Sequence, residues 1–83
     1  MKIQENLREK LRASPETEVN LIIKVKDDPA AIASYLTKAG LEVRHILRLT
    51  QAIAITGQAK ACLALADEPW VESIEEDRKV KAL

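Results

Sequence analysis

Few side chains in this sequence have the types and spacing that catalysis or metal binding requires. Metal sites need Cys, His or carboxylate ligands in clusters, whereas Cys62 and His45 each stand alone. Cys62 falls on the apolar face of a predicted helix, which indicates a small core residue. His45 falls in the inward phase of a predicted strand, and we interpret it as a residue at a strand bulge or edge. We therefore expect no catalytic residue, no metal and no cofactor.

Motifs for nucleophilic catalysis and nucleic-acid binding are also missing. No Gly-x-Ser-x-Gly segment presents a nucleophile. Gly40 and Gly57 are both expected at the boundaries between helices and strands, so neither is left for a phosphate-binding loop. Basic and acidic residues balance at 13 each, so no overall positive field attracts nucleic acid. Neither Tyr35 nor Trp70 falls on a central strand, where an RNA-binding sheet stacks bases. The sequence predicts neither an enzyme nor a nucleic-acid binder.

A block of charge near the C-terminus is the remaining chemical feature. The segment PWVESIEEDRKVKAL begins as a strand, carries four acids, turns basic and ends on apolar Leu83. Carboxylates can satisfy the free amide hydrogens of a partner's helix N-terminus and interact with the positive end of its dipole. The more ordinary interpretation of such a block is a solvated chain end. The acids are Glu72, Glu75, Glu76 and Asp77.

The elements that would position these acids alternate between strand and helix. Apolar residues at helical spacing predict an N-terminal helical arm within residues 1–16, either docked or frayed. Asp28 and Pro29 are typical of a helix start, and Gly40 of a helix end. The expected strands cover residues 19–26, 41–49, 52–56 and 71–77, with a hairpin turn at 50–51, and the expected helices cover 29–40 and 57–67.

This order predicts an α+β fold, the ferredoxin-like β-α-β-β-α-β sandwich. It has a four-stranded antiparallel sheet with two helices on one face, spans residues 17–77, and leaves the other sheet face bare. The predicted core residues are Leu21, Ile23, Ile32, Leu36, Val43, Ile53, Ile55, Leu63 and Ile74.

Three segments carry a resemblance to a known family: LIIKVKDD, QAIAIT and LALADEPWVESIEED. Together they resemble the subtilisin propeptide family, also called the inhibitor I9 family, which includes free-standing inhibitors of subtilisin-like proteases. The likeness covers roughly residues 17–83 and is most specific at residues 69–77. The third strand departs from the family, with Ala-Ile-Ala-Ile at 52–55 where relatives carry a Gly-Phe-Ala-Ala core.

The resemblance implies a free-standing inhibitor of a subtilisin-like serine protease and leaves a folding-chaperone role open. The bare sheet face would pack on two surface helices of the protease, with Glu75 and Asp77 capping their N-termini. Ile22 adds an apolar contact on that face, and Ala52 and Ala54 are small enough for a helix to approach. The tail would lie in the active-site cleft, with Val80 and Leu83 in apolar subsites. The tail residues are Arg78, Lys79, Val80, Lys81, Ala82 and Leu83.

Two alternatives come from different functional classes. Residues 25–46 also resemble the first half of an ACT domain, which would hold an amino-acid ligand in the loop between first strand and first helix. Such loops usually carry Gly where this chain has Ala30. The third hypothesis is an interaction module that pairs through the exposed sheet.

The sequence also indicates the cellular location and the oligomeric state. The N-terminus has no apolar leader-like segment, and the longest apolar run is too short to span a bilayer. A single Cys excludes an internal disulfide. We expect a cytoplasmic monomer with no membrane partner, whose bare sheet face is the surface through which a dimer would form.

Overall fold

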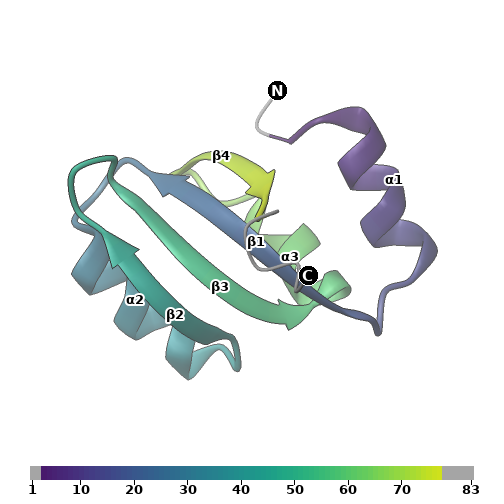
Figure 1. Cartoon of the computed structure of the whole chain (residues 1–83), viewed down its shortest axis with the longest axis horizontal. Helices are drawn as coiled ribbons and strands as arrows, with labels where there is room; N and C mark the ends of the chain where they lie inside the picture. The colour runs from purple at the N-terminus through teal and green to yellow at the C-terminus, as the bar shows by residue number, and fades with distance from the viewer. Residues whose placement is uncertain (1–2, 78–83) are drawn as a thin grey trace, which may run out of the picture.

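The computed structural model describes residues 3–77 of the 83-residue chain (Figure 1). Its elements follow the predicted order behind a helical arm. They are α1 (Glu5–Ala13), β1 (Glu18–Val25), α2 (Pro29–Lys38), β2 (Glu42–Leu47), β3 (Ala52–Gln58), α3 (Ala59–Leu65) and β4 (Val71–Glu76).

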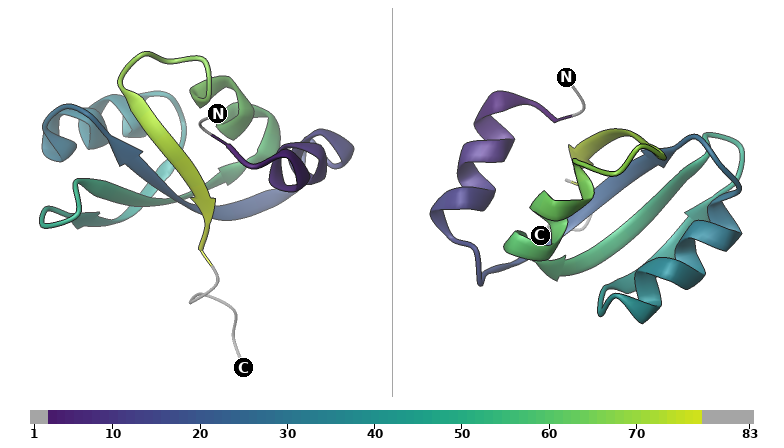
Figure 2. Two further views of the ribbon diagram at one scale, coloured as in Figure 1. Left: turned by 90° about the horizontal axis from the view of Figure 1, so that it is seen from above. Right: turned by 180° about the vertical axis from the view of Figure 1, so that it is seen from behind.

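The four strands form one antiparallel sheet in the order β2-β3-β1-β4. β1 and β3 form its centre and pair without a break from Glu18–Gln58 to Lys24–Ala52. Helices α2 and α3 both lie on one side of this sheet (Figure 2). The predicted α+β sandwich with the ferredoxin-like layout is therefore confirmed.

The core lies between the sheet and these two helices. Leu21, Ile23, Val25, Ile53 and Ile55, from the two central strands, are completely buried on the covered face. Removing such side chains from water stabilises the fold by about 1.5–3 kcal/mol each. Because these residues alternate with the residues of the opposite face, the register of β1 and β3 decides the composition of both faces.

Seven of the nine predicted core residues are buried. The other two, Val43 and Leu63, are only partly buried and pack against the edge of the core. Leu65, which is 5% exposed, takes the inward position on α3 beside Cys62. The prediction erred on this helix because its Ala- and Leu-rich sequence offers several apolar stripes of similar strength.

The start of α3 was wrongly predicted. Gly57 lies within β3 rather than at a helix start, and α3 begins at Ala59. A side chain at Gly57 would collide with the side chain of Leu41, so this position needs glycine for close packing rather than for a turn. The amide groups of Ala59 and Lys60 donate to carbonyls of Thr17 and Pro15, which satisfies the first turn of the helix.

A β-bulge changes the expected phase of β2. The pairing with β3 shifts between Val43 and His45, which makes Arg44 the extra residue. His45 therefore lies opposite Ala54 and is exposed, so its predicted inward phase is wrong, while its placement at a bulge on an edge strand is confirmed. Leu47 and Leu49 were expected in the same inward phase, but they are 40% and 103% exposed.

The N-terminal arm is docked. Ile3, Leu7 and Leu11 are 3%, 8% and 1% exposed, and they belong to the same cluster as the sheet core. Ile3 forms an isolated parallel bridge with Ile74, so it pairs with the edge of β4 that β1 does not occupy. Helix α1 lies beside α3 (Figures 1 and 2). The arm therefore protects one edge of the sheet and leaves β2 as the uncovered edge.

Across residues 3–77, none of the helices combines the length and the apolar character that crossing a membrane would take.

Docking of the arm predicts a large effect of Leu11 on stability. We expect Leu11→Ala to lower the free energy of unfolding by about 2–5 kcal/mol, because it opens a cavity in the shared core. The exposed Glu9 on the same helix is the control, and Glu9→Ala should stay within about 0.5 kcal/mol of the parent. Urea denaturation measures both; equal losses for the two variants would show that the arm does not contribute to the core.

Candidate functional site

The sheet face opposite α2 and α3, called the bare face below, is the candidate site. Strand pairing identifies its residues, because partners in neighbouring strands share a face. Ile22 pairs with Ala54 on one side and with Glu75 on the other. Three of the residues predicted for partner contact thus form one row across β3, β1 and β4. Lys24 and Ala52 form the next row.

Two shielded alanines lie at the apolar centre of the bare face. Ala52 and Ala54 are only 4% and 3% exposed, yet they do not belong to the core cluster under the helices. Pairing places each alanine between larger side chains of β1 and β2 that screen it from water. The prediction that a partner touches these alanines directly therefore needs correction: Ile22 and Leu47 offer the accessible apolar surface.

A polar network occupies the other end of the bare face. The Thr56 hydroxyl donates to Asn20 Oδ1 over 2.6 Å. An NH2 group of the Arg44 guanidinium donates to Asp77 Oδ2 over 3.0 Å and to the carbonyl of Ile55 over 3.2 Å. The backbone amide of Asp77 donates to the carbonyl of Asn20. Arg44 therefore reaches from edge strand β2 across the centre of the sheet to the end of β4.

The Arg44–Asp77 pair is mostly shielded from water. Their side chains are 18% and 7% exposed, in contrast to 60% and 33% for the ion pair Lys10–Glu76. Arg44 Nε is buried and has no partner within the described part of the chain. A charge-assisted bond in this setting is stronger than one at the surface, but each group depends on the other for its compensation.

Strand alternation sorts the acids of β4 to different surroundings. Glu76 points to the arm, where Lys10 Nζ lies 2.6 Å from its Oε2. Asp77 pairs with Arg44, whereas Glu72 and Glu75 are exposed. Of the two acids predicted to cap partner helices, Glu75 is the exposed one on the bare face. The predicted tail, Arg78–Leu83, lies outside the described residues.

Sequence reasoning missed Arg44 and Leu47. Leu47 follows the register shift, so a regular alternation assigns it to the covered face, whereas it pairs with Ala52 of the bare face. Arg44 is the bulged residue, and its contact with Asp77 joins positions that are far apart in the sequence. The strand contains no Gly or Pro from which the bulge could have been predicted.

Neither a metal-ligand cluster nor a reactive thiol occurs among residues 3–77. Residues 3–77 hold no group of three His, Cys, Asp or Glu side chains that could bind a metal ion. Cys62 is fully buried, as expected of a core residue, and burial raises the pKa of its thiol to about 11. It is therefore a neutral thiol at pH 7 and a poor nucleophile.

No protein-family model matches this sequence, and no curated protein matches it. Functional conclusions therefore rest on the geometry of the bare face.

The shielded ion pair predicts a measurable energetic coupling between β2 and the end of β4. In a double-mutant cycle with Arg44→Gln and Asp77→Asn, we expect a coupling free energy of about 1 kcal/mol or more, because each single change leaves a shielded charge without its partner. The matched control is the cycle of Lys10→Gln with Glu76→Gln, whose exposed pair should couple by at most about 0.5 kcal/mol. Urea unfolding gives both values, and a coupling no larger than that of the control would refute the structural role of the pair.

Proposed function

We propose that this protein is a propeptide-like inhibitor of a subtilisin-like serine protease. It docks through the bare face and directs the residues after β4 into the active-site cleft. The observation that carries this proposal is the row Ala54–Ile22–Glu75, in which apolar residues lie next to an exposed carboxylate, on a sheet face that neither α2 nor α3 covers.

The row suits a partner helix that packs on the bare face with its N-terminus at Glu75. Ile22 and Leu47, on either side of the shielded alanines, supply the apolar contact. A carboxylate at a helix N-terminus contributes roughly 0.3–1 kcal/mol when exposed and up to ~2 kcal/mol when partly buried. Since Asp77 is already paired with Arg44, we assign helix capping mainly to Glu75.

Asp77 has a second role in this proposal. Its backbone amide is tied to β1 and its carboxylate to β2, so the last described residue of the chain is held at a defined place on the sheet. The tail that follows would add to the cleft as a strand, with Val80 and Leu83 in apolar subsites. An anchored start lowers the conformational entropy that the tail loses on binding.

The ACT-like alternative would use the loop between β1 and α2. There the Asp28 carboxylate accepts a hydrogen bond from the amide of Ala30 and serves as the N-cap of α2, with buried Pro29 between them. This arrangement closes the helix start rather than presenting groups to a ligand. A sensor would gain about 2.7 kcal/mol of stability at a hundredfold excess of ligand over its dissociation constant, so a melting shift with free amino acids, without protease inhibition, would favour that alternative.

Glu75 tests the docking geometry. We expect Glu75→Gln to raise the inhibition constant against a subtilisin-like protease about twofold to thirtyfold, which corresponds to the loss of ~0.3–2 kcal/mol at a helix N-terminus. Glu72→Gln removes the same charge from another exposed position of β4 and should leave the constant within twofold. Equal constants for the two variants would show that Glu75 is only a solvated strand residue.

The tail tests the cleft-directed part of the mechanism. Removing residues 80–83 should weaken inhibition roughly tenfold to a hundredfold, because burying Leu83 alone is worth ~1.5–3 kcal/mol. Leu83→Asp should be worse than the truncation, since it brings a charge into an apolar subsite. Both variants should melt at the parent temperature. If the three inhibition constants agree within twofold, the tail does not enter the cleft.

A further inference from the structure

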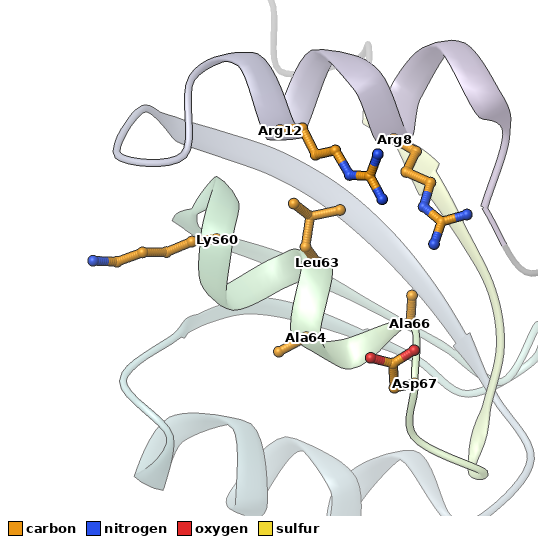
Figure 3. Close-up of a pocket in the computed structure, with 7 residues that line it drawn as sticks. All are labelled: Arg8, Arg12, Lys60, Leu63, Ala64, Ala66 and Asp67. Atoms are coloured by element: carbon orange, nitrogen blue, oxygen red, sulfur yellow. The ribbon is translucent and has the colours of Figure 1, made fainter.

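A second surface feature lies away from the bare face, between the arm and α3. It is a hollow of about 290 Å³ between the two helices (Figure 3). Two arginines of α1 form one wall. Leu63 of α3 and its C-cap residue Ala66 form an apolar floor, and Asp67 follows directly after the C-cap. The volume is at the lower limit of pockets that hold small organic molecules.

The two arginines form a concentrated positive charge. Arg8 and Arg12 are one helical turn apart, and both guanidinium groups extend over the side of α3 that carries Leu63 (Figure 3). Neither forms an ion pair within residues 3–77, in contrast to Arg44 and Lys10. Like charges at this spacing repel each other, so an anion placed between them would relieve that repulsion.

Docking of the arm holds this arrangement in place. Arg8 and Arg12 follow directly after Leu7 and Leu11, which are buried in the shared core. The buried leucines fix the rotation of α1 about its axis, and the arginines consequently lie at the rim of the core. Arg8 is half-buried as a result.

We propose that this hollow binds a small organic phosphate ester, with the phosphate held by Arg8 and Arg12 and an apolar part resting on Leu63 and Ala66. A phosphate monoester carries a charge near −2 at pH 7 and three acceptor oxygens. One such group can neutralise both guanidinium groups, each of which offers a planar fork of donors. A carboxylate or a sulfate ester carries a single negative charge and leaves one arginine uncompensated.

The other charged residues of the hollow have defined effects. Asp67 repels the phosphate, so its removal strengthens binding. The Lys60 ammonium points away from the arginines in Figure 3, and we assign it no contact. This site goes beyond the proposed inhibitor function and does not depend on it, because it uses none of the residues of the bare face.

Phenyl phosphate and phenyl sulfate are suitable probes, because they have the same shape and differ by about one charge. Calorimetric titration of the full chain at fixed ionic strength and pH 7.5 should show binding of phenyl phosphate and at least about tenfold weaker binding of phenyl sulfate. Arg8→Gln and Arg12→Gln should each lower the affinity for phenyl phosphate about tenfold, as expected for losing a hydrogen bond between charged groups. Asp67→Asn should raise it.

The control is Lys38→Gln, which removes one positive charge from an exposed position on α2 and should change the affinity less than twofold. Amide chemical shifts of the parent protein locate the site without any variant; phenyl phosphate should shift amides of α1 and α3 and leave those of β2 unchanged. No binding at 10 mM phenyl phosphate, equal affinity for the two esters, or amide shifts confined to residues other than those of α1, α3 and positions 66–67 would overturn the proposal.

Discussion

Two helices can cover only one face of a four-stranded sheet, and most features of this protein depend on that constraint. On β1 and β3, alternate residues are either completely buried under α2 and α3 or turned to the bare face. Leu21 and Ile23 therefore lie on the covered face of the strand, and Asn20 and Ile22 lie on its bare face. A shift of one residue in register would exchange the two faces, so the packing of the core also determines the composition of the candidate site.

The same alternation determines which residues the acids at the end of β4 contact. Consecutive residues of β4 point to opposite sides, so Glu76 meets Lys10 on the arm while Glu75 and Asp77 share the bare face. Asp77 is then held by Arg44 from the far edge of the sheet, which leaves Glu75 as the exposed acid of that face. The acids at the end of β4 thus lie in three environments: beside the arm, in the pair with Arg44, and exposed on the bare face. The block is consistent with a docking surface because only part of it is neutralised within the described part of the chain.

Local sequence signals predicted most of the fold. Clean alternation identified β1, the Asp28-Pro29 pair identified the start of α2, and the order of elements identified the sandwich, because each signal depends on neighbouring residues alone. A bulge or edge position was predicted for His45, but the change of phase that the bulge imposes on the residues after Arg44 was not, because no Gly or Pro in β2 marks it. Gly57 was assigned to a helix start because a close approach of Leu41, sixteen positions earlier in the sequence, leaves no local trace.

The candidate site was less accessible to sequence reasoning than the fold. Ile22, Ala54 and Glu75 were predicted on one face, and pairing places them in one row. The Arg44–Asp77 contact joins residues 33 positions apart and depends on the bulge, so it could not be predicted from a periodic pattern. The docked arm was left open between two states, because its narrow apolar stripe is too short to form a stable helix until α3 and β4 cover it.

Protease inhibition through the bare face and the residues after β4 is the proposal to test first. The experiment titrates a subtilisin-like protease of known active-site concentration with the full chain and follows cleavage of a chromogenic peptide. We expect protease activity to fall steeply and to approach zero near one equivalent of the protein, while trypsin-like proteases remain active. Undiminished activity at a hundredfold excess of intact protein would contradict it.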